Sequence, residues 1–332
     1  MPGISSSGPA VATAAGLCYG AVASDTGGSI RWPSGANGLT GLKPTWGRVS
    51  RFGVFELAAS MDHVGPIARS AADAAVLLSV LAGDDRNDPT SLATPVPEYL
   101  AATAQDIRGL RVGVDEHWIG RDVDTSVATV VTNAIEVFRK LGAETVEVRV
   151  PDMDQAVKDW VRACAVEAAV AHESTYPARA REYGPILASV LEMGRALPGF
   201  DYQKILLRRM DLQGRFEWLF RTIDVLLAPV HSFQPLSLAD VSALGLQPEL
   251  ISKLQRYTAP FNLTGNPTIT LPGGFTKTGL PTGFQLIGRH LGETTLIRAG
   301  TAYQGATDFH RHHPDISTSG RQAGNSCALH IA

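Results

Sequence analysis

The chain is poor in cysteine and has no long apolar run. Its 332 residues include only three cysteines, Cys18, Cys164 and Cys327, and no C-x-x-C pair. Thiols this few and this scattered form neither a disulfide framework nor a cysteine zinc site, so we expect a reducing compartment, the cytoplasm. No apolar run is long enough to span a bilayer, so no membrane segment is predicted.

Basic residues are missing from the N-terminus and never gather into a run. Arg31 is the first of them, so the small apolar stretch 9–23 lacks the charged region with which a signal peptide begins. The 29 Lys and Arg stand against 32 Asp and Glu, which gives a formal net charge of −3. This balance provides no electrostatic footprint for nucleic acid or for an anionic membrane.

Hydrophobic residues are plentiful, at 44% of the chain against 18% charged, and this composition excludes a disordered protein. An apolar 3.6-residue period runs from Asp124, a helix N-cap, to a stop at Gly142. Strands are predicted on either side of this helix, at 110–114 and 146–150. A strand, a helix and a strand at this spacing form a βαβ unit, so a partly parallel sheet is expected.

Caps, breakers and short apolar runs predict the remaining elements. Ser70, with Asp73 three residues later, starts a helix that Gly83 ends. The other predicted elements are proline-broken helices over 152–220, a helix at 293–305, and strands at 223–227, 268–271 and 282–287. The first 66 residues, dense in Gly, Ser and Pro, are expected to form packed loops and short strands. We therefore expect one α/β domain over residues 1–314 and a disordered tail over 315–332.

Two clusters of serine and glycine near the N-terminus have the composition of a catalytic loop. They span residues 3–8 and 25–31. Consecutive glycines, such as Gly27 and Gly28, let a loop aim several backbone N–H groups at one point, as an oxyanion hole requires. Ser29, at the end of these glycines, is placed to act as a nucleophile in acyl transfer. A tight structural turn is the alternative interpretation of an isolated Gly-Gly-Ser.

Several ordered motifs extend this pattern along the chain. They are Gly-Gly-Ser-Ile-Arg at 27–31, Gly-Leu-Thr-Gly-Leu-Lys-Pro-Thr at 38–45, Ser-Met-Asp-His-Val-Gly-Pro at 60–66 and Gly-Phe-Gln-Leu-Ile-Gly at 283–288. In these motifs the chain resembles the amidase signature family, from residue 2 to about Pro314. The resemblance implies an amide hydrolase with a Ser–Ser–Lys triad, built on a mixed, partly parallel β-sheet covered by helices on both faces.

The resemblance also implies roles for individual residues. Ser29 matches the nucleophile, and Ser5 matches the bridging serine, which the family holds in a cis peptide bond. The implied oxyanion hole consists of the backbone N–H groups of Thr26, Gly27, Gly28 and Ser29. Three further residues support the site: Asp25 and Arg31 are expected to hold the loop, and Ser6 to assist the base by a hydrogen bond.

The chain departs from the family pattern at the third triad member, which is a lysine well upstream of the bridging serine. Only four residues precede Ser5, and none of them is a lysine. The family uses that lysine, kept neutral by burial, as the base. Lys43 matches the family's own Gly-Leu-Lys-Pro-Thr element, so a structural role is expected for it. We therefore expect an N-terminally truncated domain that lacks its first elements and has impaired activity.

Three functions remain open for such a chain. The first is an amidase that hydrolyses a small-molecule amide through a Ser29 acyl-enzyme. The second is a catalytically inactive amidase remnant that acts as a binding protein. The third is an amidotransferase subunit, which would imply partner subunits and a tRNA-bound substrate. No cofactor is implied, and a homodimer is left open.

No metal site is predicted, because the candidate ligands lack the partners and spacing that a site needs. The residues considered are His310, His312 and His313 before the tail, and Asp84, Asp85 and Asp88 in a polar loop. In the helical middle, Glu167, His172 and Glu173 either line a cavity or lie on a helix surface.

Overall fold

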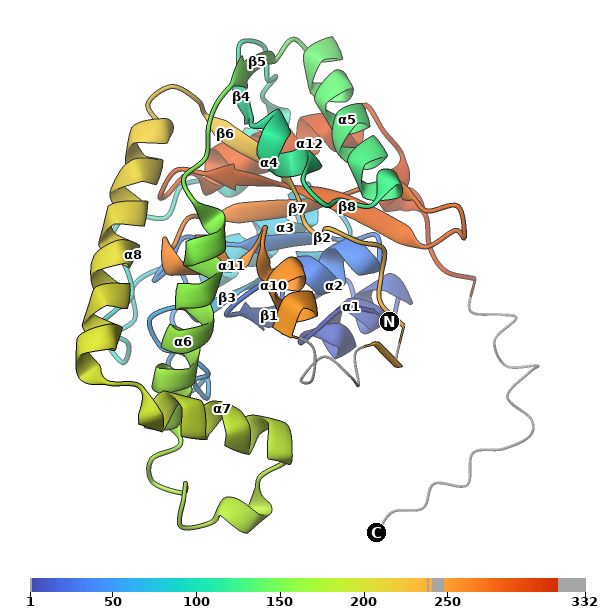
Figure 1. Cartoon of the computed structure of the whole chain (residues 1–332). Coiled ribbons are helices and arrows are strands. Elements are labelled where there is room, and N and C mark those ends of the chain that lie inside the picture. Colours follow the sequence, from blue (N-terminus) through green and yellow to red (C-terminus); the bar gives the residue numbers. More distant parts are fainter. Residues whose placement is uncertain (1, 238, 241–247, 316–332) are drawn as a thin grey trace, which may run out of the picture.

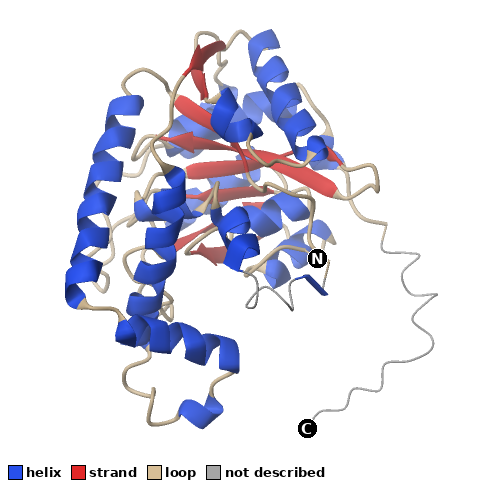
Figure 2. Cartoon of the chain, in the orientation of Figure 1, coloured by secondary structure: helices blue, strands red, loops and turns tan. Residues whose placement is uncertain are grey.

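Eight strands form one mixed sheet in the computed structural model, which describes residues 2–237, 239–240 and 248–315 (Figures 1 and 2). The order across the sheet is β1-β3-β2-β7-β8-β6-β4-β5. The strands are β1 (Gly20–Asp25), β2 (Thr40–Lys43), β3 (His63–Ala68), β4 (Arg111–Val114), β5 (Glu144–Glu147), β6 (Val225–Pro229), β7 (Thr268–Phe275) and β8 (Pro281–Gly288). Only β4 pairs in parallel, with β5 and with β6, and the other pairings are antiparallel.

Helices cover both faces of the sheet (Figure 2). The described α-helices are α1 (Ser7–Ala14), α2 (Arg31–Ala36), α3 (Ala71–Leu81), α4 (Glu116–Gly120), α5 (Thr125–Lys140), α6 (Met153–Ala171), α7 (Pro185–Ala196), α8 (Gly199–Leu219), α10 (Pro248–Gln255), α11 (Ala259–Leu263) and α12 (Glu293–Gly305). The predicted fold class, a mixed and partly parallel sheet with helices on both faces, is confirmed.

Strand β8 shows how the two faces are built, because successive side chains on a strand point in opposite directions. Phe284 is fully buried against Phe138 of α5 and Tyr303 of α12. Its neighbour Gln285 faces the other side, where it donates to the carbonyl oxygens of Pro229 and Tyr257, at 2.9 and 2.6 Å. The first face is therefore an apolar core, and the second carries the hydrogen-bonded layer around α2 and α11.

Helix caps predicted from the sequence are confirmed. The Ser70 side chain accepts a hydrogen bond from the Asp73 amide at the start of α3, and Asp124 accepts one from Ser126 at the start of α5. Pro185 is the first residue of α7, and Pro198 is the N-cap of α8, so these prolines divide the helical middle as expected. Helix α12 has the predicted bounds.

Three predictions of elements were wrong. The strand expected at 146–150 is β5, which begins at Glu144 and ends at Glu147 because its pairing with β4 ends there. The first 66 residues contain α1 and α2, where only loops and strands were expected. The strand expected at 223–227 begins two residues later and includes Pro229. The expected tail, apart from Asp315, lies outside the described residues.

None of the described helices has both the length and the apolar composition that crossing a bilayer requires.

Candidate active site

A four-residue loop, residues 26–29, connects the end of β1 to the residue before α2; we call it the glycine loop. Gly28 has φ of +146°, a conformation that other residues rarely adopt, and a Cβ on it would lie 2.2 Å from the Trp32 ring. A Cβ on Gly27 would lie 2.5 Å from the ring of Trp160. Two tryptophan rings thus pack directly on the loop backbone, and only glycine fits at either position.

The carbonyl oxygens of the glycine loop all accept hydrogen bonds. Their donors, in order along the loop, are Trp160 Nε1 (2.7 Å), Thr258 Oγ1 (2.5 Å), the Trp32 amide (2.7 Å) and the Ser6 amide (3.3 Å). Within the described part of the chain, by contrast, the amide N–H groups of these four residues have no acceptor. A buried loop with engaged carbonyls and free amides is suited to bind an anionic oxygen.

The two predicted serines lie on neighbouring segments. The Ser6 amide donates to the Ser29 carbonyl, which brings the two serine clusters together, and the Ile4–Ser5 peptide bond is cis, as the resemblance implies. Ser5 is exposed and Ser29 is half-buried. Neither hydroxyl has a hydrogen-bond partner among the residues that the structure describes. Both hydroxyl groups are therefore free to engage a substrate.

Lys43 is fully buried and does not contact either serine through a hydrogen bond within the described residues. Its Nζ donates to the carbonyl oxygens of Asn266, at 2.6 Å, and of Pro44, at 3.3 Å. Burial, together with the nearby Arg31 guanidinium, holds the pKa of Lys43 well below its usual range. Lys43 therefore joins β2 to the segment that enters β7, which is a structural role.

Asp25 and Arg31 form a fully buried ion pair directly beneath the glycine loop. Arg31 Nη2 lies 2.8 Å from Asp25 Oδ1, and Arg31 Nε lies 2.9 Å from Oδ2. Asn262 donates to both the carbonyl and the carboxylate of Asp25, each at 2.9 Å. Burial alone would raise the pKa of Asp25, but Arg31, Lys43 and Asn262 outweigh it and hold that pKa well below its usual range. The pair holds both ends of the loop.

The side chains of Ser6 and Thr26 each donate a hydrogen bond at the site. Ser6 Oγ donates to the Ser24 carbonyl of β1 at 3.3 Å. Thr26 Oγ1 donates to Asp62, which also accepts from the amides of Leu57 and Ala58. Burial raises the pKa of Asp62, and these hydrogen bonds partly oppose the rise.

Sequence reasoning missed the side chains that contact the loop from elsewhere in the fold. Trp160 and Thr258 hold its carbonyl oxygens, and Asn262 holds the preceding Asp25. Trp160 lies 134 positions from Thr26, and Thr258 lies 231 positions from Gly27. No local pattern of polarity or spacing marks them. Only Asp62 lies inside a motif that the sequence had singled out.

Two of the three residues considered in the helical middle, Glu167 and His172, have hydrogen-bond partners. Glu167 accepts from the Ser60 amide at 2.8 Å and from its hydroxyl at 2.6 Å, which anchors the segment that leads to Asp62. His172 Nδ1 lies 3.0 Å from the Tyr183 hydroxyl, and Glu173 is exposed. Within the described residues no cluster could hold a metal ion, and His313 instead contacts Arg69 at 2.6 Å.

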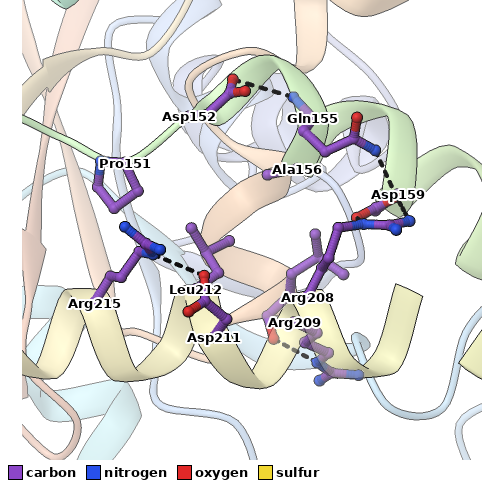
Figure 3. Close-up of a pocket in the computed structure, with 11 residues that line it drawn as sticks. Pro151, Asp152, Gln155, Ala156, Asp159, Arg208, Arg209, Asp211, Leu212 and Arg215 are labelled. Carbon is purple, nitrogen blue, oxygen red and sulfur yellow. Dashed lines mark hydrogen bonds and ion pairs between the residues drawn. The ribbon is translucent and has the colours of Figure 1, made fainter. Parts of the chain in front are cut away.

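A cavity of about 270 Å³ lies between α6 and α8 (Figure 3). Neither Ser5 nor Ser29 lines it. Its arginines already have partners: Arg208 pairs with Asp159, Arg215 with Asp211, and Arg209 donates to the Leu263 carbonyl. A much smaller hollow, about 20 Å³, adjoins the first serine cluster. Its lining is mostly apolar and includes Gly3, Ile4, Trp32, His231, Phe233 and Leu254. Of the two, only the small hollow touches the candidate site.

Acidification should destabilise the fold through His231. Burial lowers the pKa of His231 to about 4, so the folded state keeps it neutral while an unfolded chain protonates near pH 6.5. The stability it contributes is present above pH 6.5 and is lost as pH falls toward 4. We expect the free energy of unfolding to drop by about 2 kcal/mol between pH 7 and pH 5 from this group.

The measurement is urea unfolding at several pH values. His231→Gln should reduce the slope of stability against pH, and His117→Gln, at an exposed position on α4, is the control variant. An identical slope in His231→Gln would contradict the assignment. Burial also holds the pKa of His63 well below its usual range, so part of the slope should persist in every variant.

The fold and the loop define the class of this protein: a mixed-sheet α/β protein that ends its first strand in a glycine loop suited to an oxyanion. A family model for amidases matches residues 1–297, and the chain belongs to the amidase signature family. The "Putative amidase AmiD" of Mycobacterium tuberculosis is 48% identical over 315 residues, which cover 95% of this chain and 66% of that protein.

Two further relatives widen the comparison. A glutamyl-tRNA(Gln) amidotransferase subunit of Chloroflexus aggregans is 34% identical, over 96% of this chain and 69% of its own. The crystal structure of a bacterial aryl acylamidase of the amidase signature family superposes with a TM-score of 0.81 at 26% identity, over 93% of this chain and 66% of that one. The chain thus spans about two thirds of each relative.

Proposed function

We propose that this chain is an amidase in which Ser29 attacks the carbonyl carbon of a small carboxylic amide. The observation that carries the proposal is the glycine loop, whose carbonyl oxygens are all engaged while its amide N–H groups have no acceptor among the described residues. The similarity to AmiD, at 48% identity, supports the same reaction class. The free donors precede the Ser29 hydroxyl, which is the arrangement that acyl transfer requires.

The reaction proceeds in two stages. Ser29 Oγ forms a bond to the carbonyl carbon while its proton leaves through the exposed Ser5 hydroxyl, which passes its own proton to solvent water, and the oxyanion accepts hydrogen bonds from the loop amides. The carbon–nitrogen bond then breaks, and ammonia or an amine leaves with a proton. Water hydrolyses the ester and regenerates the Ser29 hydroxyl. The mostly apolar hollow beside Ile4 and Trp32 favours a substrate with a small apolar group.

Proton removal is the weak step of the proposed mechanism. Ser5 is exposed and, within the described residues, has no basic partner. A well-placed general base contributes a factor of about 10² to 10⁴ to such a step. We therefore propose an impaired amidase, with acylation slower by about this factor than in an enzyme with a complete triad.

A fluorophosphonate probe tests the assignment of Ser29, because it phosphonylates a serine that an oxyanion hole activates. We expect a slow, covalent, single-site adduct on Ser29, found by peptide mass spectrometry, and background labelling in Ser29→Ala. Ser79→Ala, on α3, is the matched control and should label like the unaltered chain. Equal labelling of Ser29→Ala and the unaltered chain would refute the active enzyme and leave the inactive binding protein.

A second candidate is an amidotransferase subunit, favoured by the 34% identity with the Chloroflexus aggregans protein. This candidate requires partner subunits, and the net charge of −3 provides no overall electrostatic attraction for tRNA. Affinity purification at physiological salt distinguishes the two candidates. Stoichiometric partner subunits would favour the amidotransferase, and a lone monomer or homodimer would favour the amidase.

A further inference from the structure

We propose that Trp160 and Thr258 are positioning residues that set the direction of the oxyanion-binding amides. The proposal rests on the function proposed for the glycine loop. Trp160 Nε1 donates to the Thr26 carbonyl at 2.7 Å, and Thr258 Oγ1 donates to the Gly27 carbonyl at 2.5 Å. Both donors come from elements outside the loop and outside the serine clusters.

The planarity of the peptide group carries the argument. In a trans peptide unit the C=O of one residue and the N–H of the next point in opposite directions. A donor on the Thr26 carbonyl therefore fixes where the Gly27 N–H points, and a donor on the Gly27 carbonyl fixes the Gly28 N–H. The Trp32 amide, which donates to the Gly28 carbonyl, does the same for the Ser29 N–H.

The two glycines of the loop explain why hydrogen-bond donors from outside it are needed. Without a Cβ, the peptide units around Gly27 and Gly28 have access to backbone angles that other residues avoid, so sequence alone does not fix their rotation. If either unit rotated, a carbonyl oxygen would point toward the site and repel a developing oxyanion. The two side-chain donors oppose that rotation, because a rotated carbonyl would lose its hydrogen bond in a buried place.

Both positioning residues are themselves held. Trp160, on α6, is 9% exposed, and its ring packs against Gly27, where a Cβ would lie 2.5 Å away. Thr258 is fully buried, and its carbonyl accepts a hydrogen bond from Arg31 Nη1 at 2.8 Å. A hydrogen bond thus connects Thr258 to the Asp25–Arg31 ion pair, so this positioning residue and the ion pair belong to one hydrogen-bonded network.

The test compares Thr258→Val and Trp160→Phe, each of which removes the donor and keeps most of the volume. Two matched controls lose an equivalent group that has no hydrogen-bond partner in the described part of the chain: Thr270→Val and Trp118→Phe. Thr258→Ser keeps the hydroxyl and should restore the native behaviour. Thermal unfolding of each variant checks that it folds. If Trp160→Phe does not fold, the result for Thr258→Val alone tests the positioning role.

Two readouts are needed. The first is the set of backbone amide resonances of ¹⁵N-labelled protein: Thr258→Val should shift or broaden the Gly28 amide, Trp160→Phe the Gly27 amide, and the controls neither. The second is the fluorophosphonate labelling rate of Ser29. Loss of a whole oxyanion donor costs about 10²–10³-fold, so misdirecting one should cost about 10-fold.

The two readouts separate the proposals. Unchanged Gly27 and Gly28 amide resonances in Trp160→Phe and Thr258→Val would overturn the positioning role, whatever the labelling rate. Shifted resonances with an unchanged labelling rate would overturn it as well. If the unaltered chain does not label at Ser29 while the resonances shift as expected, the proposed amidase function fails and the control of the amide direction stands.

Discussion

Replacing Arg31 with methionine is expected to destabilise the fold by about 3–5 kcal/mol, the cost of leaving one partner of a buried ion pair alone. Arg31 and Asp25 are both fully buried, and two contacts of 2.8 and 2.9 Å join them. Methionine fills much of the arginine volume but offers no donor. Among the described residues Asp25 would keep Asn262 and the amides of positions 30 and 31, and burial would then favour its neutral form.

Urea unfolding at pH 7 measures this loss. Arg108→Met removes an arginine from an exposed pair with Asp106 and is the matched control, for which we expect little change. Asp25→Asn combined with Arg31→Met should recover part of the stability, because no unpaired charge stays buried. A loss below about 1 kcal/mol in Arg31→Met would show that the pair does not support the loop.

Acid should remove the contribution of Asp25 to the free energy of unfolding over a defined pH range. The folded-state pKa of Asp25 lies far below its ordinary value of 3.8, since Arg31, Lys43 and Asn262 overcome the effect of burial. A carboxyl whose pKa is depressed on folding stabilises the protein above the unfolded value and loses that contribution as pH falls below it. Arg31→Met should therefore flatten the stability profile below about pH 4.

Replacing Gly28 with alanine is expected to have the second large effect. The new Cβ would lie 2.2 Å from the Trp32 ring, and φ of +146° is strained for any residue with a side chain. Backbone strain and overpacking each cost about 1–3 kcal/mol, so we expect a loss of about 2–6 kcal/mol. Because relief requires the loop to move, Ser29 labelling should fall to the level of Ser29→Ala.

Gly53→Ala separates the two causes of this loss. Gly53 also has a positive φ, +79°, but nothing lies within 4 Å of the position that its Cβ would take. It should therefore show the cost of a left-handed backbone without the collision, at about 1–2 kcal/mol. If Gly28→Ala were no worse than Gly53→Ala, the packing of Trp32 on the loop would not restrict this position.

Most of the helices and strands could be predicted from local sequence signals. The caps at Ser70 and Asp124 mark helix starts because a side-chain oxygen satisfies amides that the helix leaves free. Strand β5 was displaced in the prediction because a run of alternating valines does not show where the partner strand ends. Helix α2 was missed because its six residues contain Pro33 and Gly35 and show no helical period.

The sequence by itself determined which residues form the glycine loop and where most helices and strands lie. These features depend on local chemistry: glycine allows unusual backbone angles, and apolar spacing reports the buried face of an element. The direction of the loop amides was decided only by the tertiary structure. Each peptide unit is held through its opposite end by groups such as Trp160 and Thr258, which lie 134 and 231 positions away. Glycine permits either rotation, so only a distant donor selects one.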